Sequence, residues 1–343
     1  MASSRRITIN DVAEAAGVSV STVSLVLSGK GRISSATGQR VNDAVARLGF
    51  VRNHQAAALR GGQSGAIGLI VRDLSHPFYA DLAAGLSEAL EQQGRMLFLT
   101  QSGSGGQYRQ RCFDSLLAQG VDGIVIAGGG DDGGLLRAQA EQHQIPLIFA
   151  SRAAYPDETE AVRPDNMQAA RLLTEHLISR GHQRIAWLGG RSASLTRAER
   201  LGGFCATLMQ YGLPFHSEWV LECEATQRDA ARQVVALLRH NPTITAIICH
   251  DSIAATGAWF GLLRAGRYSG EGGMESYFDS QIALAAFAGV PEAALDDIPV
   301  TWATAPARDI GRSAAAHILQ WGNDRAKTPG CHTVPARLVL HQG

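Results

Sequence analysis

The chain has 343 residues, of which 45% are hydrophobic and 18% charged, and its formal net charge is zero. This length suits a small domain joined to one large or two medium domains, and the composition is that of a globular protein. No apolar run approaches the roughly 18 residues of a membrane span, the polar start is unlike a secretory leader, and the five scattered cysteines form no C-x-x-C pair. These features argue against membrane, secreted and zinc-binding or redox proteins, and they favour the cytoplasm.

Residues 8–27 predict two short helices separated by a turn. Thr8, with Asp11 three residues later, is a helix start signal, and Gly17 supplies the permissive backbone of a tight interhelical turn. Ser19 can cap the second helix by accepting a hydrogen bond from a following backbone amide. An apolar stripe on the second helix faces inward, and the opposite face carries Val20, Ser21, Ser24 and Leu25.

The second helix opens with small exposed residues, a shape that suits the major groove of DNA. Ser21 could bond a base edge, whereas Val20 and Leu25 could make only apolar contacts, for example with a thymine methyl group. A three-helix packing unit without a DNA role is the alternative. Residues 1–63 hold eight Lys or Arg against three Asp or Glu, a net +5 that leaves −5 on the remainder, and this asymmetry favours a contact with phosphate.

A third helix and a linker follow. The third helix is expected to begin after Ser34 or Ser35, to end at Gly49 and to close the small core. Residues 52–62 contain strong helix formers but are too few to form a stable helix alone. They could order only against a partner or DNA, and a flexible tether is the alternative.

Beyond Ala66 short apolar runs alternate with helical stretches. Strands are expected at 66–71, 96–99, 123–127, 146–150, 185–189, near 220, at 246–249 and at 284–287, and helices at 81–93, 113–118, 167–180, 196–211, 229–239 and 307–321. Buried strands with intervening helices predict parallel, doubly wound sheets in two tandem α/β lobes. A cleft between such lobes is a usual place for a small ligand.

Signals of catalysis and of cofactor binding are missing. The glycine-rich residues 128–134 follow a strand but lack the lysine and the spacing of a phosphate-binding loop, so we expect a flexible connection. The eleven histidines show no metal-binding spacing, and no G-x-S-x-G elbow occurs. We predict no catalytic residue, no metal and no cofactor.

The pattern Asp-Val-Ala-x-x-Ala-Gly-Val-Ser-x-x-Thr-Val-Ser at residues 11–24 resembles the signature of the LacI/GalR family of bacterial transcription repressors. The likeness extends over essentially the whole chain, and Leu25, 28–34 and 149–152 resemble members that control maltose genes. It implies a homodimer that binds a pseudo-palindromic operator in double-stranded DNA and responds to a small effector, often a sugar. It also implies a periplasmic-binding-protein-like core in which the chain crosses between the lobes more than once.

The resulting domain prediction has three parts. Residues 1–51 form the helix-turn-helix head, 52–62 the hinge helix or linker, and 63–343 the effector-binding and dimerisation core. Within the core, the first lobe is expected at about 63–163 plus 304–325, and the second at about 164–303 plus the C-terminal strands.

The resemblance assigns DNA contacts by position. Val20 and Ser21 match the family's specificity pair, and Leu59 matches the leucine that opens a base step from the minor groove. Leu25 stands where the family usually has Arg, which removes the commonest guanine reader and predicts a different base in the operator. The predicted DNA-binding residues are Thr8, Ser19, Val20, Ser21, Ser24, Leu25, Ser28, Arg32, Asn53 and Leu59.

The resemblance also assigns an effector site. Phe78 lies in a segment like the family's Asn-Pro-Phe-Phe loop, where its ring could stack on a sugar or only pack the helix start. Arg200 matches the family's effector-binding Arg, although a solvated helix face is the alternative. Ala288 stands where an acid usually holds the ligand, which puts the usual sugar geometry in doubt. The predicted effector-binding residues are Ser75, Phe78, Arg152, Arg200, His250 and Asp251.

Three classes of function compete: an effector-responsive DNA-binding repressor, a sugar-binding protein with no DNA role, and a nucleotide-dependent enzyme. The basic amino end and the lack of a leader argue against the second class, and the missing motifs argue against the third. We therefore predict a repressor of a maltose-related carbohydrate operon, modulated by an effector such as maltose and located at the nucleoid of a bacterial cytoplasm. No heptad-like tail follows residues 332–335, which favours a dimer over a tetramer.

Overall fold

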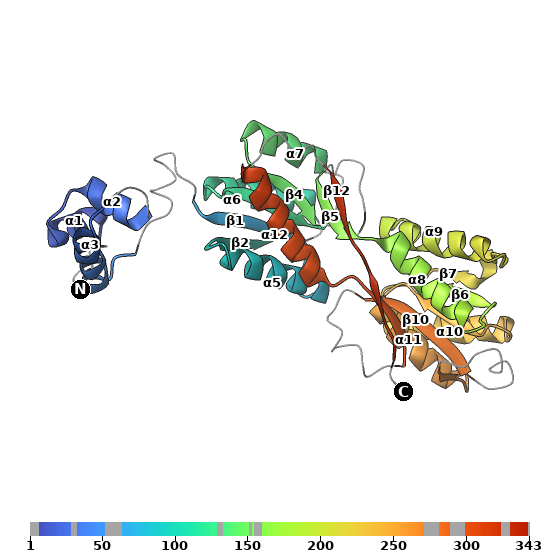
Figure 1. The fold of residues 1–343 in the computed structure, drawn as a ribbon. Helices are drawn as coiled ribbons and strands as arrows, with labels where there is room; N and C mark the ends of the chain where they lie inside the picture. Colours follow the sequence, from blue (N-terminus) through green and yellow to red (C-terminus); the bar gives the residue numbers. More distant parts are fainter. Residues whose placement is uncertain are drawn as a thin grey trace, which may run out of the picture. The chain divides into compact units, whose positions relative to one another are not determined.

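The computed structural model describes residues 7–28, 33–51, 64–103, 105–128, 133–150, 153, 160–270, 281–288, 299–323 and 330–341 (Figure 1). They belong to two compact units, the first ending at Ser64 and the second beginning at Gly65. Among these residues every helix falls short of the length or the apolarity that crossing a membrane requires.

The first unit contains the three expected helices, α1 (Ile9–Ala16), α2 (Val20–Ser28) and α3 (Ser35–Leu48). The hydroxyl of Ser34 caps α3 by accepting from the amide of Thr37 at 3.3 Å. The helices enclose a small core of Val12, Ala13, Ala16, Val23, Val41 and Ala44. The periodic apolar positions of the sequence are therefore the residues that hold the three helices together.

The first lobe of the second unit is a parallel sheet in the order β12-β5-β4-β3-β1-β2. Its strands are β1 (Ala66–Val71), β2 (Met96–Gln101), β3 (Gly123–Ala127), β4 (Leu147–Ala150), β5 (Ala161–Pro164) and β12 (Cys331–Val334). Helices α5 (Pro77–Glu91) and α12 (Ala307–Asn323) pack on one face, and α6 (Gly106–Ala118) and α7 (Gly133–Gln142) on the other. Helix α7 begins inside residues 128–134, which the sequence had indicated as a flexible connection.

The second lobe has the strand order β13-β11-β10-β8-β6-β7, with β9 paired to β10. Its strands are β6 (Ile185–Leu188), β7 (Val220–Leu221), β8 (Ala246–Cys249), β9 (Tyr268–Ser269), β10 (Gln281–Ala288), β11 (Thr301–Thr304) and β13 (Arg337–Val339). Helices α8 (Asn166–Ser179) and α9 (Leu195–Gln210) cover one face, α10 (Gln227–His240) and α11 (Ser252–Arg264) cover the other, and a short 3-10 turn spans Ser217–Trp219. Both faces of both sheets are thus covered, which explains why the strands read as continuous apolar runs.

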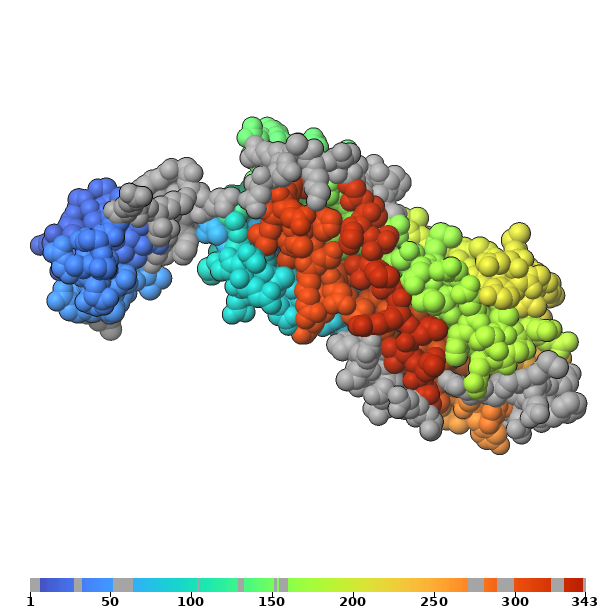
Figure 2. Space-filling view, viewed as in Figure 1, coloured from blue at the N-terminus to red at the C-terminus, as the bar shows by residue number. Residues whose placement is uncertain are grey.

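The chain crosses between the lobes after β5, after β11 and after β12. The prediction that the C-terminal strands belong to the second lobe is wrong for β12. Cys331 to Val334 pair with Ala161 to Pro164 and extend the edge of the first sheet, whereas β13 pairs antiparallel with β11 of the second sheet. Figure 2 shows this C-terminal segment, in red, at the surface and reaching from the first lobe to the second.

Candidate functional site

The turn between α1 and α2 has the geometry that its sequence predicts. The carboxylate of Asp11 accepts from the backbone amide of Thr8 at 2.7 Å and from its hydroxyl at 2.6 Å. Gly17 adopts a left-handed conformation with φ of 64°, which an L side chain rarely adopts. The hydroxyl of Ser19 accepts from the amide of Thr22 at 3.2 Å and so caps the start of α2. These local contacts fix the angle at which α2 leaves the turn.

The outer face of α2 is less uniform than predicted. Ser21 is exposed and Leu25 is 41% exposed, so both can reach a ligand of the head. Ser24 is half-buried, and Val20 is half-buried against the head core. The expectation that Val20 lies on the face opposite the core is therefore corrected, because the start of α2 turns this side chain partly inward.

Five predicted residues cannot be placed by their side chains. Ser28 is the last residue of α2, and its side chain is outside the described part of the structure. The remaining four lie outside the described residues altogether: Arg32, Asn53, Leu59 and Arg152.

A cavity of about 330 Å³ lies between the two lobes of the second unit. The predicted residues Ser75 and Phe78 line it from the first lobe, and Arg200 and Asp251 line it from the second. Two hydrogen bonds from Ser75, at 3.0 and 2.8 Å, hold the pKa of Asp73 below its ordinary value. The cavity thus combines apolar rings with acidic and basic side chains, as a site for a small polar ligand requires.

Arg200 is held in place by contacts on three sides. Its Nε donates to Oδ1 of Asn166 at 3.0 Å, and one terminal nitrogen donates to the carbonyl of His250 at 2.6 Å. The guanidinium lies over the ring of Phe287 at 4.4 Å, a cation–π contact. Asn166, 1% exposed, and Phe287, 2% exposed, also line the cavity. The alternative of a solvated helix face therefore does not describe Arg200.

His250 and Asp251 follow the same strand but lie differently. Asp251 lines the cavity and caps α11 by accepting from the amide of Ala254 at 2.8 Å. The side chain of His250 is 8% exposed, packs beside Trp187 with ring centroids 6.4 Å apart, and is absent from the cavity lining. The prediction of His250 as an effector contact is corrected, since it contributes its carbonyl to Arg200 instead.

Two cavity residues, Asn166 and Phe287, were not predicted as ligand contacts. Asn166 is the first residue of α8, directly after the capping residue Asp165, which accepts from the amide of Gln168 at 2.9 Å. Phe287 lies within the apolar run of β10, where the sequence predicts an ordinary buried strand residue. Beside it, Ala288 lines the cavity, so the wall where the family usually has an acid is apolar here.

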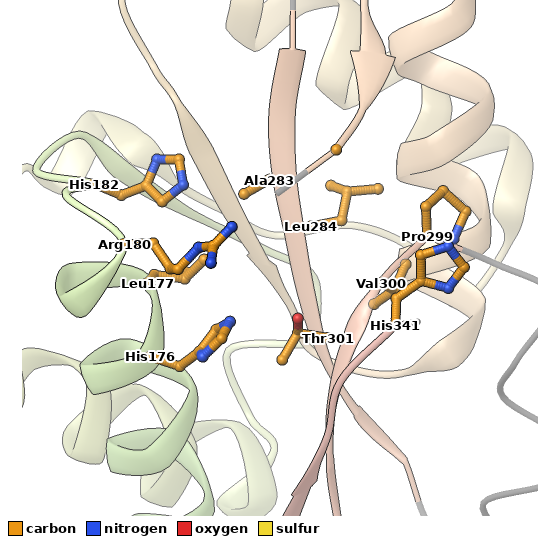
Figure 3. Close-up of a pocket in the computed structure, with 11 residues that line it drawn as sticks. His176, Leu177, Arg180, His182, Ala283, Leu284, Pro299, Val300, Thr301 and His341 are labelled. Carbon is orange, nitrogen blue, oxygen red and sulfur yellow. The ribbon is translucent and has the colours of Figure 1, made fainter. Parts of the chain in front are cut away.

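A second cavity, of about 30 Å³, lies within the second lobe. His176, Arg180 and His182 stand on one side of it and His341 on the other (Figure 3). His182 is 2% exposed, and burial is the main reason that its pKa falls to about 4. Such a volume holds about two water molecules, which excludes a sugar.

The comparisons with known proteins agree with both units. Residues 8–53 match the family described as bacterial regulatory proteins of the lacI family, and residues 64–341 match periplasmic binding proteins and the sugar binding domain of the LacI family. The chain is 62% identical over 339 residues to the maltose regulon regulatory protein MalI of Escherichia coli (strain K12), which covers 99% of both proteins. It is 30% identical to the HTH-type transcriptional regulator DegA of Bacillus subtilis (strain 168), over 73% of this chain and 75% of that protein.

Solved structures extend the likeness to the fold. The Lac repressor dimer bound to operator and the anti-inducer ONPF matches with a TM-score of 0.82 and 25% identity, over 98% of each chain. The transcriptional regulator CelR in its complex with cellobiose matches with a TM-score of 0.66 and 25% identity, over 98% of this chain and 99% of that one. With a lacI-type head and a sugar-binding type core that together span almost its whole length, the chain belongs to the LacI family of bacterial transcriptional regulators.

Proposed function

We propose that this protein represses a maltose-related carbohydrate operon, and that a sugar such as maltose, bound between the lobes, changes its affinity for the operator. The observation that carries the proposal is the 62% identity to MalI over 99% of both chains. Similar folds include a repressor dimer on its operator and a regulator in complex with the disaccharide cellobiose. In this proposal the protein is a homodimer that binds DNA and effector without catalysing a reaction, and it is located at the nucleoid of a bacterial cytoplasm.

At the operator, α2 enters the major groove of each half-site. Ser21 bonds a base edge and Leu25 contacts a thymine methyl group, while Val20 packs partly against the head and supports the start of the helix. Leu59 opens a base step from the minor groove. The remaining predicted residues make supporting contacts, chiefly to the DNA backbone: Thr8, Ser19, Ser24, Ser28, Arg32 and Asn53.

In the cavity, the chemistry of the lining suits a sugar. Nε of Arg200 and one of its terminal nitrogens donate to Asn166 and to the carbonyl of His250, and Phe287 lies under the plane of the guanidinium. The other terminal nitrogen can donate to a sugar hydroxyl. The carboxylate of Asp251 accepts from a hydroxyl, and Ser75 adds a polar contact. The ring of Phe78 lines the cavity but is only 5% exposed and packs into the core of the first lobe, so it offers a small apolar contact. Arg152, which follows β4 in the sequence, is proposed as a further contact to the effector.

Regulation follows from the position of the cavity between two lobes. An effector that binds one relative arrangement of the lobes more tightly shifts the population towards it. A coupling of about 1–3 kcal/mol, or roughly 5–150-fold in operator affinity, is typical of such regulation.

Arg200→Met tests the effector site by fluorescence anisotropy. A labelled duplex from the promoter next to the gene is titrated with the protein, with and without maltose. We expect maltose to change the apparent Kd of the natural protein, and Arg200→Met to lose that response while its Kd without sugar stays within about twofold.

Arg171→Met, an exposed change on α8, is the matched control and should respond normally. A natural protein that ignores maltose and related sugars at every concentration would refute the effector part of the proposal. Failure to prefer the operator over a scrambled duplex would refute the repressor part.

A further inference from the structure

A continuous set of hydrogen bonds connects the effector cavity with the strands that cross between the lobes. It runs from Arg163 on β5 through Glu199 and Asn166 to Arg200. We propose that these four residues, the crossover relay, link the relative angle of the lobes to the position of the effector-binding arginine. This inference rests on the proposed function, because it assigns a regulatory role to the contacts behind the effector site.

The first step of the relay is an ion pair between the lobes. Arg163 lies on the last strand before the first crossing, and Glu199 lies on α9 of the second lobe. One guanidinium nitrogen of Arg163 is 3.2 Å from each carboxylate oxygen of Glu199, and the two side chains are only 19% and 22% exposed. The Nε of Arg163 also donates to Sγ of Cys331 on β12 at 3.1 Å. Arg163 therefore connects Glu199 with two strands that each precede a crossing.

The second step passes through the amide of Asn166. Its Nδ2 donates to Oε2 of Glu199 at 2.7 Å, and its Oδ1 accepts from Nε of Arg200 at 3.0 Å. Only one orientation of the amide satisfies both neighbours, because the reverse would set a donor against the guanidinium and an acceptor against the carboxylate. Because Asn166 is buried and its amide is oriented by Glu199, Glu199 fixes the position of Oδ1 of Asn166, the atom that accepts from Arg200.

The relay lies at the first crossing between the lobes and contacts the strand that precedes the third. Arg163 and Asn166 stand on opposite sides of the first crossing, only three positions apart, so a rotation there changes the geometry of the Arg163–Glu199 pair. The guanidinium of Arg200 lies over Phe287 at the other end, inside the cavity. A ligand that holds Arg200 favours one lobe angle, and by linkage that angle favours the ligand. Glu199 and Arg163 are positioning residues in this scheme.

Two variants break the ion pair and spare the cavity. Glu199→Gln keeps an oxygen for Asn166 but removes the charge that Arg163 meets, and Arg163→Met removes the same link from the other side. Both should bind maltose within about threefold of the natural protein by calorimetry, yet lose at least fivefold of the sugar's effect on operator affinity. The double variant should lose no more of the response than Arg163→Met alone, because both single changes remove the same Arg163–Glu199 ion pair.

Arg191→Met is the matched control. It breaks the ion pair of Arg191 with Glu224, which has a similar distance of 3.0 Å but side chains 71% and 68% exposed. We expect the full response to maltose from this variant. Glu199→Ala, which also removes the acceptor for Asn166, should weaken maltose binding itself and so separate positioning from coupling.

A second measurement requires no sugar. Pulsed electron resonance on the full-length protein gives the distance distribution between labels at two exposed positions, Glu91 on α5 and Arg239 on α10. The labels are attached to non-natural amino acids, because the five cysteines are free thiols. Arg163→Met and Glu199→Gln should broaden the distribution between the lobes, and Arg191→Met should not.

The two measurements separate the two proposals. A natural protein that responds to maltose, with ion-pair variants that respond equally and give unchanged distances, overturns the relay and leaves the proposed function intact. A natural protein without any sugar response overturns the effector role. In that case the distance distribution alone decides whether Arg163 and Glu199 restrain the lobes, and an unchanged distribution overturns the relay as well.

Discussion

The cavity residues show what position in a sequence can and cannot predict. Arg200 and Asp251 were predicted from the family pattern, and the structure places both on the lining. Asn166 was missed as a cavity residue because its role depends on Arg200, a partner 34 positions away. His250 follows a strand as a ligand contact often does, but successive side chains leave a strand on opposite sides, and spacing alone does not say which side faces the cavity.

Leu25→Arg tests whether the exposed face of α2 contacts bases in the operator. Leu25 is 41% exposed on α2 and offers no hydrogen bond to a base. An arginine there can bond guanine through two N–H groups, a contact worth about 1–3 kcal/mol of discrimination. Selection of bound duplexes from a randomised operator pool should show a gain of guanine at one base pair of each half-site, with the other positions unchanged. If no base preference moves, α2 does not read the groove through this residue.

His182 should make stability depend on pH. Its pKa falls from 6.5 to about 4 because the ring is buried neutral. Between these values the unfolded chain binds a proton that the folded chain does not. The contribution of the neutral ring is therefore complete above pH 6.5 and is lost as the pH falls towards 4. From pH 7 to 4.5 the natural protein should lose about 1–3 kcal/mol more unfolding free energy than His182→Gln. Urea titrations followed by tryptophan fluorescence test this, and parallel curves for the two proteins would contradict it.

The elements that were not predicted lack a polar face or a strong local signal. Helix α11 was missed because its sequence is small or apolar on nearly every side, so no amphipathic period stands out. It packs closely on α10, where a Cβ at Gly257 would lie 2.5 Å from the carbonyl of Gln227. Strand β5 was missed because it has only four residues, and β12 was expected in the wrong lobe because its partner lies about 170 positions away in the chain. Such pairing depends on tertiary contacts, so the hydrophobic pattern of the short segment does not predict it.

Gly85→Ala tests the close approach of α5 and α12. A Cβ at Gly85 would overlap the backbone carbonyl of Arg308, so the two helices would have to separate. We expect a loss of about 1–3 kcal/mol in the unfolding free energy of the core. Gly202→Ala on α9 is the control, since a Cβ there has nothing within 4 Å, and it should stabilise the core by about 0.5–1 kcal/mol. Equal effects of the two changes in denaturant titrations would show that α5 and α12 are not packed this closely.

At the scale of the whole molecule, the amino-terminal segment and the rest of the chain carry opposite net charges. Residues 1–63 carry +5 and the remainder −5. Contacts with phosphate release counterions, so operator affinity should fall steeply with salt, by about a thousandfold or more between 50 and 200 mM if the dimer makes six or more such contacts. Anisotropy titrations across this range give the slope. A nearly flat dependence would show that the basic segment does not meet the DNA backbone.

The return of the C-terminal segment to the first lobe constrains how the protein is made. The head leaves the ribosome first, but the first sheet lacks its edge strand and one of its covering helices until residues 307–334 have been synthesised. A chain interrupted earlier leaves the apolar faces of β1 and α5 without α12 and is a substrate for proteases or aggregation. Nonsense mutations before residue 307 should therefore yield rapidly degraded fragments rather than an unregulated repressor. A stable, regulated DNA-binding head exists only after the C-terminal segment has been synthesised.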